Sequence, residues 1–522
     1  MDLPGRVVVV GAGVGGLTAA VELARRGLEV TVLERAARVG GKMREVEVAG
    51  RTFDVGPTVL TMRSTFDEIF QAAGETLDEH VTLDPVEVLA RHAWSDGSRL
   101  DLFSDVDRTA DAIGTFAGAR ESQGYRRFCE YARDIHETVK GPFLTAERPT
   151  LVSIVKAFGT IGVGALLKMD GYRTLWGALG DFFHDPRLLQ LFGRYATYAG
   201  SSPFSAPATL NVIAHVEREG VWLVRGGMYR LAEALSAVAQ KLGATVRTGA
   251  SVSEILVEGG RATGVRLTTG ETLHASAVVL NADSAALREG LFGKGLKRAV
   301  DSPGPRSLSA MTWAVVGTTR GVPLVRHNVF FSDDYPREFR QLFDQGAVPD
   351  APTVYVCAQD RDDAGAIGGV PAGAPAGDTT PVPERLFCLV NAPANGDSRT
   401  LTLTEIQRCE TAMKEILLRC GLTMTESAPP LVTTPSDFAR MFPATGGALY
   451  GAASHGWMAP FSRPGARART PGLYLCGGSA HPGAGVPMVA QSARLAARAL
   501  MSDLASTWRS KRVAMPGGMS MR

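Results

Sequence analysis

The 522-residue sequence lacks several features that would assign it to a common class. Its six cysteines contain no CxxC pair, which argues against a disulfide framework and against a zinc site. No apolar run approaches the roughly 18 residues that a spanning helix needs, and the first run, Val7 to Val10, ends at Gly11. We therefore expect no signal peptide and no transmembrane helix, and a location in the reducing cytoplasm.

An excess of charge is also missing. Lys and Arg number 55 and Asp and Glu 53, so no global field draws the protein to nucleic acid. The sequence shows no Ser-His-Asp arrangement, no metal-ligand cluster and no P-loop, and we expect no bound metal. Hydrophobic residues at 45% and charged residues at 21% indicate a globular protein, which is long enough for two or three structural units.

Glycine, in contrast, is abundant, with 59 residues, and the first glycine cluster follows a strand pattern. Val7 to Val10 is an apolar, β-branched run typical of a strand buried on both faces of a parallel sheet. A GxGxxG pattern comes next, and a helical apolar pattern then extends to Gly27. The stretch 29–33 predicts a second strand that ends at Glu34. A strand–glycine–helix–strand unit of this kind predicts a dinucleotide site.

Each glycine of this unit has a physical role. Gly11 permits the tight turn, Gly13 lets the backbone approach a pyrophosphate, and Gly16 lets the helix pack closely on the strand. Gly15, in the same turn, is a further candidate for cofactor binding. The free N–H groups and the positive dipole end of the helix would meet the phosphate charge. Glu34 can accept hydrogen bonds from ribose hydroxyls, and its charge disfavours the 2′-phosphate of NADP.

The next segment resembles the large FAD family that includes amine oxidases and carotenoid desaturases. The resemblance is carried by an ExxxxxGGK turn with Arg35, Gly41 and Lys42, and by Gly56-Pro57. It implies that the glycine pair runs along the cofactor and that Gly56 and Pro57 lie near the flavin ring. Two ordinary turns remain the alternative for these residues.

A second glycine-rich turn lies near the end of the chain. The strand-like stretch 472–476 leads into the string GGSAHPGAGVPM. This string begins with Gly477 and Gly478 and contains Gly485, Val486 and Met488, and a helical pattern follows it. Its free N–H groups would suit the flavin pyrimidine edge or the ribityl chain. The HPGxGxP core resembles the C-terminal signature of bacterial carotenoid desaturases.

The stretch 222–300 predicts a return to the nucleotide-binding domain, with one helix after Gly226 and several strands. The resemblance implies that the backbone near Val252 contacts the adenine, and plain sheet scaffolding is the alternative. We predict an α/β fold: a Rossmann-type FAD-binding domain with an inserted α+β substrate domain. The predicted segments are 1–90, 222–300 and 465–505 for the FAD-binding domain, 91–221 and 301–464 for the substrate domain, and 506–522 for a basic tail with a frayed terminus.

Internal blocks resemble one branch of this family more narrowly, the 1-hydroxycarotenoid 3,4-desaturases. They include 311–315, 327–335 and 449–457. The resemblance implies FAD-dependent hydride transfer from an allylic carbon of a carotenoid, with a new C3–C4 double bond. Candidates for a catalytic proton acceptor are His481, His455 and Arg194, although a structural role is the stronger expectation for each. A phytoene desaturase, an amine oxidase and a non-redox prenyl-binding protein of the same architecture remain alternatives.

A carotenoid substrate is drawn from a bilayer, so we searched for a membrane-docking segment. The stretch 150–180 contains few charges, and Leu151, Ile154, Val155 and Phe158 recur at helical spacing. This pattern predicts either an interfacial helix or an amphipathic helix on the protein's own core. With the interfacial helix, the protein would be peripheral on the inner face of the cytoplasmic membrane. The stretch 358–384 is rich in Gly, Ala and Pro and predicts a mobile surface loop.

Overall fold

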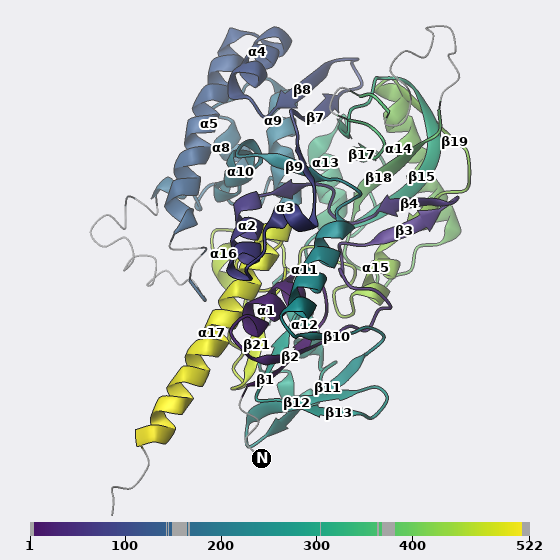
Figure 1. Cartoon of the computed structure of the whole chain (residues 1–522). Helices are drawn as coiled ribbons and strands as arrows, with labels where there is room; N and C mark the ends of the chain where they lie inside the picture. Colours follow the sequence, from purple (N-terminus) through teal and green to yellow (C-terminus); the bar gives the residue numbers. More distant parts are fainter. Residues whose placement is uncertain are drawn as a thin grey trace, which may run out of the picture.

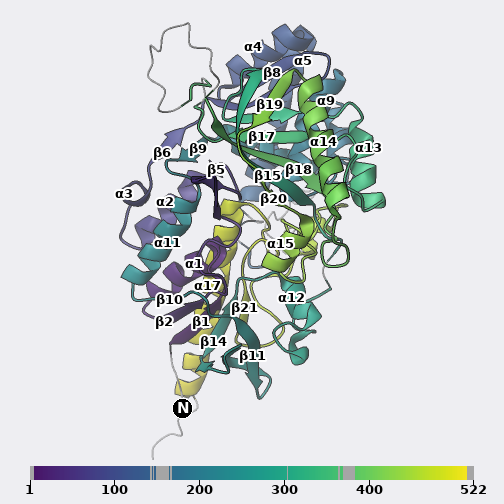
Figure 2. The same ribbon diagram turned by 90° about the vertical axis from the view of Figure 1, so that its right-hand side faces the viewer.

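The computed structural model describes residues 5–141, 144, 146–148, 164, 167–302, 304–362, 365–367 and 382–513. Figures 1 and 2 show a parallel sheet with its helices in one half of the molecule and a larger, mostly antiparallel sheet in the other. A helical layer lies beside the larger sheet (Figure 1). The predicted interfacial helix around Ile154 and Phe158 falls outside the described residues.

The parallel sheet has the strand order β10-β2-β1-β14-β21. Every neighbouring pair in it is parallel, so the carboxyl ends of all its strands meet at one edge. The central strand carries four consecutive valines, of which Val7 and Val9 face one layer and Val8 and Val10 the other. This double burial explains the unbroken apolar run. The strands are β1 (Arg6–Val10), β2 (Glu29–Leu33), β10 (Thr245–Arg247), β14 (Ala277–Leu280) and β21 (Leu473–Leu475).

Helices cover one face of this sheet and an antiparallel three-stranded sheet covers the other. Helix α17 runs alongside α1 and its last turns project from the body (Figure 1). The helices are α1 (Val14–Ala24), α2 (Arg63–Ala72), α11 (Tyr229–Lys241) and α17 (Val486–Val513). The covering strands are β11 (Val252–Glu258), β12 (Arg261–Leu267) and β13 (Thr272–His274).

The larger sheet has the order β19-β15-β18-β17-β16-β7-β8, and β20 pairs with β15. Helix α14 packs on one of its faces through an apolar cluster that includes Trp313 and Met413. The pair β16–β7 is parallel and the other pairs are antiparallel. The elements are β7 (Val88–Ala93), β8 (Arg99–Phe103), β15 (Ser309–Gly321), β16 (His327–Phe330), β17 (Val354–Ala358), β18 (Glu384–Ala392), α14 (Leu403–Arg419), β19 (Leu422–Glu426) and β20 (Leu431–Thr433).

Aromatic side chains from several helices pack against the other face of the larger sheet. Phe183 and Phe192, for example, stack with ring centroids 4.6 Å apart. The helical elements here are α4 (Val106–Ala117), α5 (Ala119–Lys140), α8 (Leu175–Leu179), α9 (Pro186–Gly193), η2 (Arg194–Ala199), η3 (Ala208–Asn211), α10 (Val212–Arg218), α13 (Tyr335–Phe339) and the π-helical turn η5 (Arg340–Asp344).

Short elements connect the two halves. Strands β5 and β6, from the first predicted segment of the FAD-binding domain, pair with β9. Strand β9 begins at residue 221, where we predicted the substrate domain to end. Strand β7 crosses the boundary predicted at residue 90 and belongs to the larger sheet. The short elements are β3 (Glu45–Val48), β4 (Arg51–Asp54), β5 (Leu60–Thr61), α3 (Leu77–His80), β6 (Leu83–Pro85), β9 (Val221–Val224), α12 (Ser284–Glu289), η4 (Lys294–Leu296), α15 (Pro435–Met441) and α16 (Ala459–Ser462).

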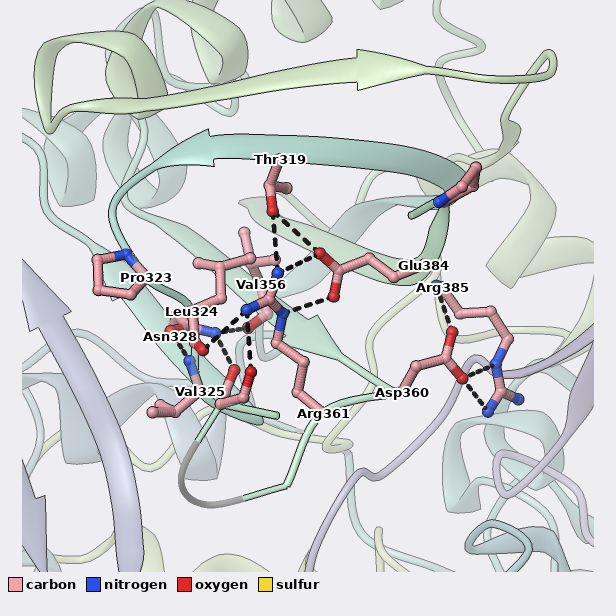
Figure 3. A network of polar contacts seen from close by, with 12 residues as sticks. Thr319, Pro323, Leu324, Val325, Asn328, Val356, Asp360, Arg361, Glu384 and Arg385 are labelled. Atoms are coloured by element: carbon pink, nitrogen blue, oxygen red, sulfur yellow. Dashed lines mark hydrogen bonds and ion pairs between the residues drawn. The ribbon is translucent and has the colours of Figure 1, made fainter. Parts of the chain in front are cut away.

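The predicted surface loop begins and ends in a network of charged side chains (Figure 3). The Arg361 guanidinium donates to both carboxylate oxygens of Glu384 at 2.6 Å, and Thr319 donates to the same carboxylate at 2.9 Å. Beside it, the Arg385 Nε donates to Asp360 at 2.9 Å. These bonds join the chain after β17 to the start of β18. Residues 363–364 and 368–381 of the predicted loop lie outside the described residues.

The prediction of a frayed basic tail over residues 506–522 is wrong for its first part. Helix α17 continues to Val513, so the backbone of the first part of the basic tail is helical, because the sequence has no glycine or proline between Pro487, in the first turn, and Pro516. Within the described ranges, no helix is both long and apolar enough to span a membrane.

Candidate functional site

A cavity of about 490 Å³ opens at the carboxyl edge of the parallel sheet. This volume lies within the range of ordinary cofactor and ligand sites. Most of the predicted cofactor residues line it: Gly11, Gly13, Gly15, Glu34, Arg35, Gly41, Lys42, Gly56, Pro57, Val252, Gly477, Gly478, Gly485 and Val486. Gly16 and Met488 are close in sequence to residues that line the cavity, but they do not line it themselves.

The first glycine turn places the N-terminus of α1 in the cavity wall. Gly13 is the N-cap, and no side chain caps the helix, so the first backbone N–H groups are available to a ligand. A Cβ on Gly16 would lie 1.9 Å from the carbonyl oxygen of Gly11, and one on Gly15 would lie 2.5 Å from Oδ1 of Asn281. Glycine is therefore required at both positions by close packing, and at Gly16 the contact is the helix–strand approach that the sequence predicts.

The Glu34 carboxylate, directly after β2, stabilises this turn through two hydrogen bonds from the backbone. One oxygen accepts from the Ala12 N–H at 2.8 Å and the other from the Ala36 N–H at 2.8 Å. The side chain lines the cavity and is almost fully buried. A carboxylate has about four acceptor positions, so the two backbone bonds leave room for hydroxyl donors from a ligand.

The second glycine turn reaches the same cavity from the far end of the chain. Strand β21 pairs with β14, which pairs with β1, so the two glycine turns stand on either side of Asn281. The Asn281 amide donates to the Gly11 carbonyl at 3.3 Å, and a Cβ on Gly477 would lie 2.8 Å from its Oδ1. The N-terminal residues of α17, Val486 and Val489, also line the cavity. Two helix N-termini thus face one space.

Positive side chains surround the first turn. Lys42 is buried, and its Nζ donates to the carbonyl oxygen of Leu449 at 2.6 Å; burial lowers the pKa of this amine to about 8. Arg35 donates to the carbonyl oxygens of Arg440 and Met441 at 2.6 Å each. Both predicted residues therefore join the cavity wall to the loop that follows α15.

Arg44 was missed by the sequence analysis. It lines the cavity, and its buried Nη2 has no hydrogen-bond partner among the described residues. Burial lowers the pKa of this guanidinium. A buried donor without a hydrogen-bond partner is costly, so a ligand anion that accepts from Nη2 would stabilise it. Arg44 follows Lys42 of the GGK turn by two residues, but this position does not by itself indicate that its side chain reaches the cavity.

The other half of the cavity wall is apolar. It is formed by the two strands of the larger sheet that carry Thr312, Phe387 and Leu389, together with Pro57 and Tyr450. Arg463 holds the loop at Tyr450 against the second glycine turn, because its Nη1 donates to the Gly478 carbonyl at 2.7 Å. Burial lowers the pKa of Arg463 to about 10. The cavity therefore has a polar end at the glycine turns and a dry end at the larger sheet.

The three candidates for a proton acceptor lie elsewhere. His481 is buried in the second glycine turn and its backbone N–H donates to Pro464. His455 accepts from the Ser202 N–H at 3.1 Å, and burial lowers its pKa. Arg194 is buried among the aromatic side chains of η2. None of them lines the cavity, and its described lining contains no histidine.

Two groups of histidine and carboxylate side chains lie close enough within the described residues to share a cation. One is His136, His215 and Glu219, and the other is Glu75, Glu79 and His80. Neither group lines the cavity. The sequence spacing had not indicated them, and the absence of a bound metal stays a prediction.

Comparisons with known proteins agree with this geometry. The family model for flavin-containing amine oxidoreductases matches residues 14–501. The hydroxyneurosporene desaturase of Rubrivivax gelatinosus is 52% identical over 99% of this chain and 97% of its own length. That of Cereibacter sphaeroides is 45% identical over 96% of this chain and 98% of its own. A solved structure of a putrescine oxidase double mutant, redesigned in its cofactor binding, has a TM-score of 0.58 at 15% identity and covers 96% of this chain and 99% of its own.

Proposed function

The chain belongs to the flavin-containing amine oxidoreductase family, alongside hydroxyneurosporene desaturases, and from this premise we propose that it is an FAD-dependent carotenoid desaturase. Its membership makes it a flavin-dependent oxidoreductase and confirms the resemblance found in the sequence. The reaction we propose is C3–C4 desaturation of 1-hydroxycarotenoids such as 1-hydroxyneurosporene and rhodopin. The observation that carries this proposal is the 52% identity over nearly the whole length of both chains.

The polar end of the cavity suits the dinucleotide part of FAD. The pyrophosphate would lie at the uncapped N-terminus of α1, where the N–H groups after Gly13 and the unpartnered Arg44 supply positive charge. Glu34 would accept from the ribose hydroxyls, and the backbone near Val252 would contact the adenine. The flavin end would then extend toward Gly478 and the N-terminus of α17.

The dry end suits a polyene substrate. The FAD that the glycine turns and Glu34 would hold would supply a hydride acceptor for C4 of the carotenoid, and a proton would leave C3. The protein's part is to orient the chain and exclude water, for which Phe387, Leu389 and Pro57 provide an apolar wall. The polyene itself delocalises positive charge, which reduces the need for a strong base. We assign no residue as the proton acceptor.

The substrate would reach the enzyme from a membrane surface. Four large apolar side chains on one part of the molecule are exposed: Leu167 at 60%, Tyr172 at 66%, Trp457 at 56% and Met458 at 42%. Their segments are adjacent, because the Gly456 N–H donates to Ser205 and the Ala208 N–H donates to Arg173. We propose that this apolar edge docks on the inner face of the cytoplasmic membrane.

The decisive experiment is incubation of the purified protein with carotenoids in liposomes. We expect a yellow protein with non-covalent FAD that converts 1-hydroxyneurosporene or rhodopin to a product with one additional conjugated double bond. Phytoene should react far more slowly. Efficient conversion of phytoene to lycopene would contradict the proposed substrate and leave the desaturase assignment intact. A colourless protein that takes up no FAD would contradict the whole proposal.

A further inference from the structure

A buried arginine outside the cavity wall has unused hydrogen-bond donors. Arg194, the first residue of η2, is 6% exposed, and its Nη1 donates to the Tyr198 hydroxyl at 2.6 Å. Its Nε and Nη2 have no partner among the described residues. Burial opposes the charge, but Tyr198 and Glu217 raise the pKa of Arg194, so the guanidinium stays protonated. Such a group is expensive to bury unless something accepts its remaining hydrogens.

A buried histidine nearby has an unused nitrogen. His327 on β16 is 3% exposed, its Nδ1 lies 2.8 Å from the Tyr355 hydroxyl, and its Nε2 has no partner among the described residues. Burial, with smaller effects from Arg326 and Arg194, lowers the pKa of His327 to about 3. The imidazole is therefore neutral. His327 lies on the same face of β16 as Val329, which packs in one apolar cluster with Tyr195 and Ala196 of η2, the residues that directly follow Arg194.

A chain of hydrogen bonds connects His327 to the cavity. The Tyr355 hydroxyl lies 2.8 Å from Thr58 Oγ1, and Thr58 directly follows Pro57 in the cavity wall. Leu389, which pairs with Tyr355 across the sheet, also lines the cavity. If Tyr355 donates to Thr58 and accepts from Nδ1 of His327, then Nε2 is left as an acceptor.

Tyr198 makes this region accessible. It accepts from Nη1 of Arg194 at 2.6 Å, and 39% of its surface remains accessible. The hydroxyl group that holds Arg194 therefore belongs to an accessible side chain.

We propose that Arg194 and His327 together bind the tertiary hydroxyl group at the end of the carotenoid. The guanidinium of Arg194 donates to the hydroxyl oxygen, and the hydroxyl hydrogen is donated to Nε2 of His327. A hydroxyl is both donor and acceptor, so it satisfies both unused groups at once. A methoxy group can only accept, and a hydrocarbon end satisfies neither, so both would leave buried polar atoms unpaired. This inference rests on the proposed function and names the residues that would select its substrate.

The position agrees with the proposed reaction. The hydroxyl oxygen is separated from C4 by four bonds of about 1.5 Å each, so it lies within about 6 Å of the reacting carbon. The hydroxyl site must therefore be next to the flavin end of the cavity. Thr58 and Tyr355 connect His327 to that end through Pro57, the residue that we expect beside the flavin ring.

The test compares three substrates with two variants. Arg194→Met removes the donors at similar length, and His327→Phe removes the acceptor at similar shape. The substrates are 1-hydroxyneurosporene, its 1-methoxy derivative and neurosporene, assayed in liposomes with the FAD-loaded enzyme. We expect Arg194→Met to lower the ratio of kcat/KM for the hydroxy substrate over neurosporene at least tenfold. We expect His327→Phe to bring the hydroxy-to-methoxy ratio close to one.

His92→Phe is the matched control. His92 is a buried histidine on the neighbouring strand β7, its Nδ1 lies 3.2 Å from the Leu100 carbonyl oxygen, and its Nε2 is also unpartnered among the described residues. This variant should leave both ratios unchanged; if it removes the selectivity and His327→Phe does not, His327 is the wrong acceptor. Flavin absorbance and the melting temperature report whether each variant folds.

Three further outcomes decide the proposal. An equal loss of kcat/KM on all substrates would show a purely structural role and overturn it. Unchanged ratios in both variants would overturn it as well. A parent enzyme that desaturates none of the three carotenoids would refute the proposed function instead, which separates the two failures.

Discussion

Glu34 offers the sharpest test of the cofactor site, because its carboxylate accepts from the protein backbone and, in the proposed complex, also from the ribose of FAD. Its two oxygens already accept from the Ala12 and Ala36 N–H groups at 2.8 Å. In Glu34→Gln, one of these oxygens becomes an NH2 group that faces a backbone donor. The remaining oxygen is neutral, so its bonds to ribose hydroxyls lose their charge assistance.

The magnitude follows from these bonds. A hydrogen bond to a charged group contributes about 1.5–3 kcal/mol, and about 1.4 kcal/mol corresponds to one decade in affinity. Loss of a single such bond to the ribose should therefore weaken FAD binding at least tenfold. Glu34→Ala removes both acceptors and should weaken binding further, with a lower melting temperature of the apoprotein because the Ala12 N–H is then left unpaired.

FAD titration of the apoprotein, followed by flavin fluorescence, measures the affinity. Glu29→Gln is the matched control: Glu29 lies on the same strand, and its exposed carboxylate pairs only with Arg6 at 3.0 Å among the described residues. This control should bind FAD like the parent. If Glu34→Gln and Glu34→Ala also bind FAD like the parent, the carboxylate does not hold the ribose and the predicted nucleotide orientation is wrong.

Two other predictions follow from burial and exposure. Burial raises the pKa of Glu338 to about 7, so its stabilising protonated form is lost as the pH rises through 7. A glutamine side chain carries no charge at any pH, so the unfolding free energy of Glu338→Gln should exceed that of the parent by about 2 kcal/mol more at pH 8 than at pH 5. Urea unfolding at the two pH values measures this difference, and a constant difference would contradict the prediction. The double variant Trp457→Asp, Met458→Asp should bind liposomes of anionic lipid less tightly and keep its flavin spectrum. Leu403→Asp, at a still more exposed site on α14, should bind like the parent. Equal binding by all three proteins would refute the docking edge.

The local parts of the nucleotide site could be predicted from the sequence because they are encoded locally. The valine run, the glycines and the acidic strand end are consecutive, and β2 has the predicted bounds of 29–33. Their geometry depends on backbone conformation and on helix and strand periodicity, which short stretches of sequence determine. The second glycine turn was predictable for the same reason, since a strand pattern precedes it and a helix pattern follows it.

The residues that join these parts could not be predicted, because their contacts depend on strand order. Asn281 lies between the two glycine turns only because β14 pairs with β1 on one side and with β21 on the other. Nothing in the stretch 277–283 indicates that its amide would pack against both Gly15 and Gly477. Arg44 is a similar case, since its unpartnered nitrogen is apparent only when the cavity wall is assembled.

The same dependence on long-range packing explains why the selectivity site has no sequence signature. Arg194 was a candidate in the predicted substrate domain, and His327 begins one of the blocks that resemble the hydroxycarotenoid branch, but the two are far apart in the chain. They come to one region of the molecule because β16 pairs with β17, which places His327 beside Tyr355, and because residues of η2 and β16 pack in one apolar cluster. Unused donors and acceptors are a property of the folded interior, so a site of this kind is found by accounting for hydrogen bonds in the structure. It follows that relatives with the same glycine turns can differ in substrate through buried polar residues of the larger sheet, while their nucleotide sites stay alike.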